Sequence, residues 1–351
     1  MKSKLNIAPI ANPLECCGYP KGQIRKEPEQ EFNFFLYNTV ISAAPKKSRG
    51  GPCSNDHDVR LSNEMTGALA CSLILNSNNG NKVKPMCSKA PLSKNQLSRK
   101  LYNIDKSKPI IIICHGLLSW RNQMLVSNLA LEMSSSLEIE AHTLRFDFMA
   151  SGHSPGIWKF ANYEQDYRDL CQIVKFIQDD LQCKVACIVG HSQSAAAVIQ
   201  YASAHDNSQY QHICYVNLAG RYLLPNDFNP DTIFDQEQCR QLTQQKYFDL
   251  IKSGESDMNR SLQFRQEDID NRNAFDISTA ANGIERSHVL TIHGDADVTV
   301  PVQDAYKFEK AIRNHTLKIL KGASHNFNGL RFMDDLVDTI TTFISSFTKD
   351  L

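Results

Sequence analysis

From about residue 109 onward, short apolar runs rich in β-branched residues alternate with longer stretches whose apolar positions recur at helical spacing. This alternation constrains the fold most, because it is typical of a parallel β-sheet in which each strand is followed by a covering helix. The predicted strands are 109–114, 142–148, 185–190, 213–218, 289–293 and 317–320. The predicted helices are 122–135, 163–181, 193–204, 302–312 and 331–347. The sequence therefore predicts an α/β fold.

Three segments interrupt or precede this pattern. Residues 222–287 are too long for one crossover helix, and their apolar positions predict a helix with a partial apolar face, and thus a small inserted helical cap. The positions in question are Phe234, Leu242, Tyr247, Phe248, Leu250 and Ile251. Residues 76–107 are rich in Ser, Asn and Lys and predict an inserted loop. Residues 1–60 predict a partly disordered N-terminal extension, so the main domain is expected over 61–351.

Composition excludes several classes of function. The chain of 351 residues has 38 Lys and Arg against 38 Asp and Glu, a net charge of zero, which argues against nucleic-acid binding. No apolar run approaches the ~18 residues of a spanning helix, and the first residues lack a secretory signal's apolar core, so we expect a cytoplasmic protein without stable membrane insertion. The 11 cysteines form no CxxC pair, so no metal site is predicted.

The sharpest local motif is Gly190-His191-Ser192-Gln193-Ser194, which joins a buried strand to a helix. A serine on a tight strand-to-helix turn presents its hydroxyl at the helix N-terminus, where backbone N–H groups can stabilise an oxyanion. The usual pattern of such a nucleophile elbow is G-x-S-x-G, and here Ser194 replaces the second glycine. The motif alone is equally compatible with an incidental serine in a βα turn.

Two further residues follow in the order that a catalytic triad requires. The strand 289–293 ends in a polar loop with two acids, Asp295 and Asp297, and the last strand is followed by His325. Taken singly, these are a turn acid and a solvated loop histidine. Because nucleophile, acid and base all follow parallel strands in this order, the sequence predicts a triad of Ser192, Asp297 and His325.

An oxyanion hole is predicted from a fourth segment. The buried strand 109–114 ends in His115-Gly116, and the glycine allows the following backbone to approach the serine. We therefore assign the two oxyanion donors to the N–H groups of Leu117 and Gln193. His115 and His191 are interpreted as structural histidines.

These motifs resemble the α/β-hydrolase superfamily, and within it the short-capped serine esterases and acyl hydrolases. That group includes uncharacterised plant, fungal and protist hydrolases and feruloyl-esterase-like and monoacylglycerol-lipase-like enzymes. The resemblance covers about residues 63–348 without the 76–107 insertion and includes a turn shaped by Asp147 and Gly152. It implies a mostly parallel sheet with flanking helices and a cap. It also implies that Asp297, three residues after Gly294, is the triad acid.

The residues and the resemblance together predict a serine hydrolase. We expect it to cleave carboxylic esters of small or medium acyl groups through an acyl-enzyme, with no cofactor and no metal. The expected partner is a small-molecule ester, and the protein is expected to be a monomer or a homodimer. A thioesterase or serine peptidase on the same scaffold stays open, because a triad does not choose the leaving group. A catalytically inactive hydrolase-like binding protein is the alternative from another class.

Overall fold

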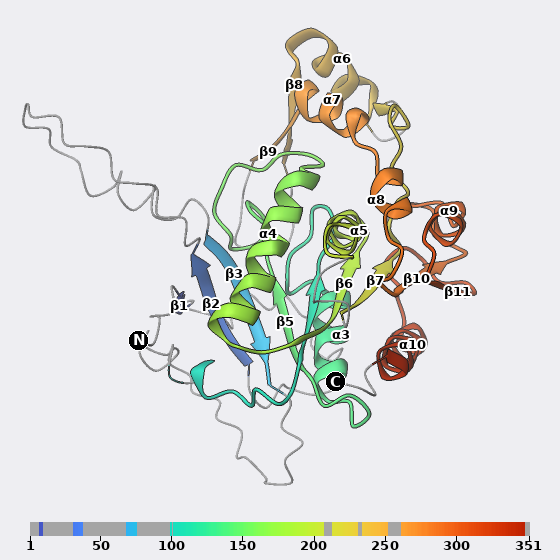
Figure 1. Cartoon of the computed structure of the whole chain (residues 1–351). Coiled ribbons are helices and arrows are strands. Elements are labelled where there is room, and N and C mark those ends of the chain that lie inside the picture. The colour runs from blue at the N-terminus through green and yellow to red at the C-terminus, as the bar shows by residue number, and fades with distance from the viewer. Residues whose placement is uncertain are drawn as a thin grey trace, which may run out of the picture.

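A mixed β-sheet forms the centre of the computed structural model, which describes residues 7–9, 31–37, 68–75, 99, 101–206, 213–230, 234–251 and 261–347. Over these residues the sheet has nine strands in the order β1-β2-β3-β5-β4-β6-β7-β10-β11 (Figure 1). The strands are β1 (Ile7–Pro9), β2 (Glu31–Tyr37), β3 (Ala68–Ile74), β4 (Ile110–Cys114), β5 (His142–Phe146), β6 (Val185–His191), β7 (Cys214–Leu218), β10 (Val289–Gly294) and β11 (His315–Leu320).

The strands from β5 to β11 in this order all pair in parallel, whereas β3 is antiparallel to both β5 and β2, and β1 is antiparallel to β2. Every residue of β4, β6 and β7 is buried. Strands covered on both faces must be apolar throughout, which explains the continuous runs in the sequence. The predicted α/β fold with a mostly parallel sheet is confirmed.

Helices cover both faces of the sheet. They are α3 (Met124–Ser134), α4 (Tyr163–Lys175), a π-helical turn η1 (Phe176–Asp180) that continues α4, α5 (Ser194–Ala204), α9 (Gln303–Ala311) and α10 (Leu330–Phe347). Buried side chains of α3 and α10 share one apolar core, and those of α4, α5 and α9 share the other. Each of these five α-helices begins within two residues of its predicted start. The loops that follow the parallel strands carry the residues of the candidate site.

The sheet begins earlier than the predicted domain boundary. Strands β1 and β2 come from within the predicted extension 1–60 and extend the antiparallel edge of the sheet. The prediction of a domain starting at residue 61 therefore leaves out two strands. The remainder of that extension and most of the predicted loop 76–107 lie outside the described residues.

The cap lies between β7 and β10, above the sheet in Figure 1. It consists of α6 (Gln236–Gln245), β8 (Tyr247–Ile251), β9 (Ser261–Arg265), α7 (Gln266–Ala274) and α8 (Ser278–Asn282), with β8 and β9 pairing antiparallel. The prediction that one helix includes Tyr247 to Ile251 was wrong. The helix ends at Gln245, its C-cap Lys246 has a left-handed φ of 69°, and the chain then continues as a strand. The cap is therefore mixed rather than purely helical.

Aromatic side chains hold the cap against the body. Phe264 of β9 stacks on Phe248 of β8 with ring centroids 5.0 Å apart. The same ring meets Trp158 and Phe160 of the loop before α4, at 5.0 and 5.2 Å. Aromatic pairs at such distances stabilise beyond the area that they bury. The two ends of the cap also meet, because the Ile277 N–H donates to the Leu223 carbonyl at 3.0 Å.

Candidate active site

Ser192 lies on a tight turn between β6 and α5. Its φ of 56° is in the left-handed region, which is uncommon for residues other than glycine and stores strain. The Ser192 N–H donates to the Leu218 carbonyl at 2.9 Å and so fixes the turn against β7. A Cβ atom at Gly190 would lie 2.6 Å from Val198 Cγ2 and 2.7 Å from the Ser194 carbonyl oxygen, so strand and helix cross too closely for a side chain there. This geometry is that of a nucleophile elbow.

Ser194 occupies the position where the motif usually has a second glycine. Its side chain is buried, and its Oγ lies 3.1 Å from the Cys114 carbonyl oxygen and 3.0 Å from that of His191. The hydroxyl therefore links the end of β4 to the elbow. Where the usual motif has glycine, this chain therefore has a buried hydroxyl that is hydrogen-bonded to two carbonyl groups.

The structure brings the three predicted triad side chains together. His325, in the loop after β11, places its Nε2 2.9 Å from Ser192 Oγ and its Nδ1 2.8 Å from Asp297 Oδ2. The three side chains thus form one hydrogen-bonded chain across loops that follow three parallel strands. The distances are those that proton transfer between neighbouring groups requires.

Asp297 is held as a carboxylate by several donors. Its Oδ1 accepts hydrogen bonds from the Thr299 and Val300 N–H groups, both at 2.8 Å, and its Oδ2 also lies 3.3 Å from His293 Nε2. Burial would raise the pKa of this carboxyl, but the hydrogen bonds from His293, His325 and Val300 outweigh it and hold the pKa well below its usual range. A charged acceptor therefore faces His325 Nδ1.

The second acid of the loop has another partner. Asp295 is exposed, and its Oδ1 accepts a hydrogen bond from the Gly322 N–H at 2.5 Å. It thereby joins the loop after β10 to the turn after β11. Of the two acids, Asp297 is the one that contacts His325.

His191 supports the loop that carries His325. Burial, with a smaller contribution from the nearby His325, lowers the pKa of His191 to about 4, so its ring is neutral near pH 7. Its Nε2 lies 3.0 Å from the His325 carbonyl oxygen, and the two rings lie 5.0 Å apart. The neutral ring donates Nε2–H to that carbonyl, which agrees with the structural role predicted for His191.

The loop after β4 approaches the serine closely. A Cβ atom at Gly116 would lie 3.0 Å from Ser192 Cβ, so a side chain would crowd the nucleophile. His115 lies beneath this loop, where its Nε2 accepts from the Phe148 N–H at 3.2 Å and its Nδ1 bonds the Gly116 carbonyl at 2.9 Å. In the part of the chain that the structure describes, the N–H groups of Leu117 and Gln193 have no hydrogen-bond partner. Both N–H groups are therefore available as hydrogen-bond donors.

A buried acid that the sequence reading missed lies behind Gln193. The Gln193 Nε2 donates to Asp166 Oδ2 at 2.7 Å, and burial raises the pKa of Asp166 to about 7. Nearby Asp169 accepts from the Met149 N–H at 2.7 Å, and burial raises its pKa to about 6. Acidic residues are common in the first turns of a helix because they interact favourably with the helix dipole. The position of Asp166 in α4 therefore did not indicate a contact with Gln193.

Asp147, predicted to shape the turn after β5, is buried in an ion pair with Arg121. Its Oδ1 accepts from the Arg121 N–H at 2.6 Å, and its Oδ2 accepts from the His153 N–H at 2.8 Å. Although burial opposes it, the Arg121 guanidinium holds the pKa of Asp147 well below its usual range. This pair fixes the turn that leads from β5 towards the cap.

The described residues hold neither a metal-binding cluster nor a membrane-spanning helix. They contain no group of three or more His, Cys, Asp or Glu side chains arranged to hold a metal ion. They also contain no helix with the length and apolar character needed to cross a membrane.

Comparisons with known proteins agree with the fold. The family model described as alpha/beta hydrolase fold matches residues 109–213, which include β4, β6 and the elbow. The chain has the α/β-hydrolase fold. This confirms the resemblance inferred from the motifs, at the level of the fold. A search of curated proteins found no matching sequence.

Solved structures of α/β hydrolases extend the match beyond that segment. Est1E from Butyrivibrio proteoclasticus, solved with ferulic acid bound, is 17% identical, with a TM-score of 0.56 over 80% of this chain and 96% of its own. A putative hydrolase from Agrobacterium vitis S4 is 14% identical, with a TM-score of 0.50 over 79% of this chain and 93% of its own. Identities this low show the shared fold and no more.

Proposed function

We propose that this chain is a serine hydrolase that cleaves carboxylic esters of small or medium acyl groups through an acyl-enzyme. The observation that carries the proposal is the hydrogen-bonded chain from Ser192 Oγ through His325 to Asp297. The structural similarity to Est1E, which was solved with ferulic acid bound, supports this reaction class without fixing the substrate.

In the first half of the reaction, His325 Nε2 takes the proton of Ser192 as the serine oxygen attacks the ester carbonyl. Asp297 keeps the proton of His325 on Nδ1 and stabilises the imidazolium that forms. Because its carboxyl stays ionised, it supplies this charge throughout the neutral pH range. The imidazolium then gives its proton to the leaving alcohol, and an acyl-enzyme on Ser192 remains.

Backbone donors act on the tetrahedral intermediate. The N–H groups of Leu117 and Gln193 meet the negative oxygen, at positions set by the glycine at 116 and by the start of α5. In the second half of the reaction, water attacks the acyl-enzyme with His325 as base, and the acid product leaves. These steps need only groups of this chain and water.

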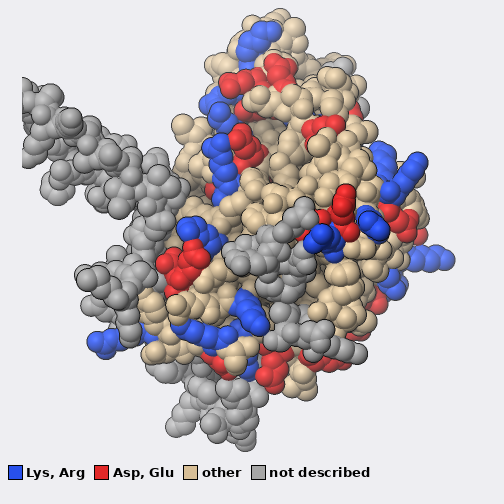
Figure 2. Space-filling view, in the orientation of Figure 1, with Lys and Arg blue, Asp and Glu red and all other residues tan. Residues whose placement is uncertain are grey.

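The charge distribution fits a substrate that is neutral at the scissile bond. Figure 2 shows positive and negative side chains interspersed on the face viewed, in agreement with the zero net charge. Such a surface provides no long-range attraction for a polyanion.

The test is ester turnover combined with labelling of the nucleophile. Purified protein is assayed with p-nitrophenyl butyrate, and Ser192→Ala is expected to lower kcat by roughly 10³ to 10⁶. A fluorophosphonate probe is expected to modify Ser192, as read by peptide mass. Ser203→Ala, a serine further along the same helix, is the matched control and retains activity. Equal rates for Ser192→Ala and the parent protein would refute the proposal.

A chain-length series then tests the substrate range. p-Nitrophenyl esters from acetate to palmitate are expected to show the highest kcat/KM at short or medium length. Matched thioesters and aminoacyl amides separate an esterase from a thioesterase or peptidase. A higher kcat/KM for the thioester or amide would move the assignment to that class.

A further inference from the structure

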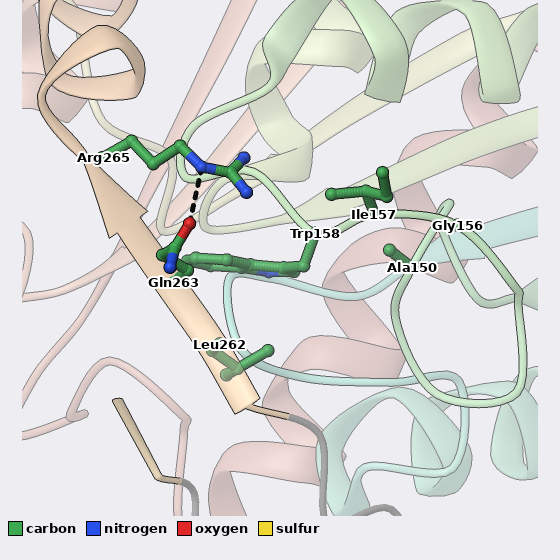
Figure 3. Close-up of a pocket in the computed structure, with 7 residues that line it drawn as sticks. All are labelled: Ala150, Gly156, Ile157, Trp158, Leu262, Gln263 and Arg265. Atoms are coloured by element: carbon green, nitrogen blue, oxygen red, sulfur yellow. Dashed lines mark hydrogen bonds between the residues drawn. The ribbon is translucent and has the colours of Figure 1, made fainter. Parts of the chain in front are cut away.

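A cavity of about 310 Å³ lies between the loop after β5 and strand β9 of the cap (Figure 3). We call it the Trp158 pocket. It is lined by Ala150, Gly156, Ile157, Trp158, Leu262, Gln263 and Arg265. Its volume falls within the range of sites that hold small organic molecules.

The cationic group of the pocket is Arg265. Its Nε donates to Gln263 Oε1 at 2.8 Å, which fixes the side chain at the end of β9 (Figure 3). Among the described residues, no carboxylate forms an ion pair with its guanidinium. Asp268 interacts electrostatically with Arg265 and Lys159, and Asp249 Oδ1 accepts a hydrogen bond from Gln263 Nε2 at 3.2 Å. The remaining guanidinium N–H groups can bind an anion.

The planar group of the pocket is the Trp158 indole. Figure 3 shows the ring edge-on, with Arg265 on one side of its plane and Leu262 on the other. The ring meets Phe264 in a T-shaped contact at 5.0 Å, which holds its orientation. A flat ligand that stacks on the indole therefore lies within reach of a fixed positive charge.

The pocket and the nucleophile share one edge of the sheet. Ala150 to Trp158 follow the carboxyl end of β5, and Ser192 follows that of β6. Both strands pair with β4, one on each side, so their axes lie roughly 10 Å apart. The loop that lines the pocket and the turn that carries Ser192 therefore leave the same edge of the sheet, from strands that flank β4.

We propose that the Trp158 pocket binds a planar, negatively charged group of the substrate, such as an aromatic carboxylate, at a distance from the scissile ester. Trp158 stacks on the ring and Arg265 pairs with the charge. This inference rests on the proposed hydrolase function for its connection to Ser192. It extends that function by naming a substrate class.

Binding is measured without turnover, on full-length Ser192→Ala protein, by ¹⁹F NMR. 4-Fluorobenzoate is expected to show line broadening that saturates, and the uncharged 4-fluorobenzamide is expected to bind at least about tenfold more weakly. Adding Arg265→Gln is expected to weaken the carboxylate about tenfold and to leave the amide unchanged. The control is Arg240→Gln, an exposed arginine of α6 outside the pocket, which leaves both affinities unchanged.

Fluorescence gives a second reading at the stacking residue. The chain has two tryptophans, so Trp120→Phe leaves Trp158 as the only indole emitter. 4-Fluorobenzoate is expected to change its emission with the affinity measured by NMR. The pocket assignment is overturned by any one of three results: equal binding of the acid and the amide, unchanged binding in Arg265→Gln, or unchanged Trp158 emission.

The connection to the substrate is tested on the active enzyme. 4-Fluorobenzoate is expected to compete with p-nitrophenyl benzoate, raising KM with kcat unchanged, and Arg265→Gln is expected to abolish the competition. Binding without competition overturns the substrate role. If the parent protein hydrolyses no ester but Ser192→Ala still binds 4-fluorobenzoate, the proposed function is overturned and the pocket assignment is not. Failure of the function and failure of the pocket assignment are therefore distinguishable.

Discussion

The nucleophile region and the cap are built on different principles. Around Ser192, the loops follow buried parallel strands, and main-chain bonds and close glycine contacts fix each side chain. The cap is held by aromatic packing around Phe264, and its outer surface carries exposed pairs such as Glu237 with Arg240. Under the proposed function, the region around Ser192 positions the reacting atoms and the cap selects the substrate. Substitutions in the first should therefore change kcat, and those in the second should change KM or stability.

Within the region around Ser192, the largest difference in kcat is expected between substitutions of its two acids. Asp297→Asn removes the charge opposite His325 Nδ1 and is expected to lower kcat by roughly 10³ to 10⁴. Asp295→Asn alters only the contact with the Gly322 N–H and should leave kcat within a few-fold of the parent. Steady-state hydrolysis of p-nitrophenyl butyrate measures both. The reverse order would move the triad acid by two positions.

The cap is tested by removing its central ring. Phe264→Ala leaves a cavity among Trp158, Phe160 and Phe248, and is expected to cost about 3–5 kcal/mol of unfolding free energy. KM should rise about tenfold, since the cap loses its fixed position, while kcat changes little. Urea unfolding and steady-state kinetics measure the two effects, with Arg240→Gln as the surface control. A loss confined to kcat would contradict the division between the two regions.

A buried acid near the oxyanion donors gives a pH-dependent test. The pKa of Asp166 is raised to about 7 in the folded protein, above the value near 3.8 of the free side chain, so the folded state holds its proton more tightly. That contribution to stability is complete below pH 4 and is lost as the pH rises through 7. Asp166→Asn keeps an acceptor for Gln193 and should therefore gain about 3 kcal/mol of stability relative to the parent between pH 5 and pH 8.

Urea unfolding of both proteins at the two pH values measures this difference, and titrating groups that do not interact with Asp166 cancel in the comparison. Asp169 does interact with Asp166, so the double variant Asp166→Asn/Asp169→Asn is compared with Asp169→Asn to isolate the Asp166 contribution. Asp276→Asn, an exposed acid of the cap, is the control and should show no such gain. An identical pH dependence for the parent and Asp166→Asn would show that the carboxyl titrates normally.

The smallest expected effect belongs to Ser194. Ser194→Ala removes the hydroxyl between the Cys114 and His191 carbonyls and is expected to cost about 1 kcal/mol of stability, with kcat lowered a few-fold. Ser194→Gly restores the usual motif but also lacks the hydroxyl, so it should be no more active than the alanine variant. Thermal unfolding and initial rates measure both. A glycine variant faster than the parent would show that the hydroxyl hinders the elbow.

The strand, turn and helix around Ser192 were predictable from the sequence because their constraints are local. A continuous apolar run, a small residue and a serine at a strand end together specify a strand, a close crossing and an elbow. The contact between Gln193 and Asp166 was not predictable in this way, since it depends on how α4 packs beside α5. No residue pattern within either helix records that packing.

The cap was predicted less well for a physical reason. Its helix ends at Gln245, and the C-cap Lys246 has a left-handed conformation that usually calls for glycine, so the sequence contains no stop signal there. The apolar positions that follow suit either a helix face or a strand. The pairing of β8 with β9 selects the strand. Hydrophobic periodicity within one segment cannot reveal this pairing, because β9 lies further along the sequence.

The bond between the Ile277 N–H and the Leu223 carbonyl closes the cap at its base. Because the chain leaves and re-enters the body at one place, this segment behaves as a long loop with its ends already joined. Changes in the length of such a loop cost little conformational entropy. This architecture makes the cap a replaceable module: a segment of different length and lining could be exchanged there while β7, β10 and the elbow keep their places. Substrate range and catalytic geometry could then evolve, or be engineered, separately.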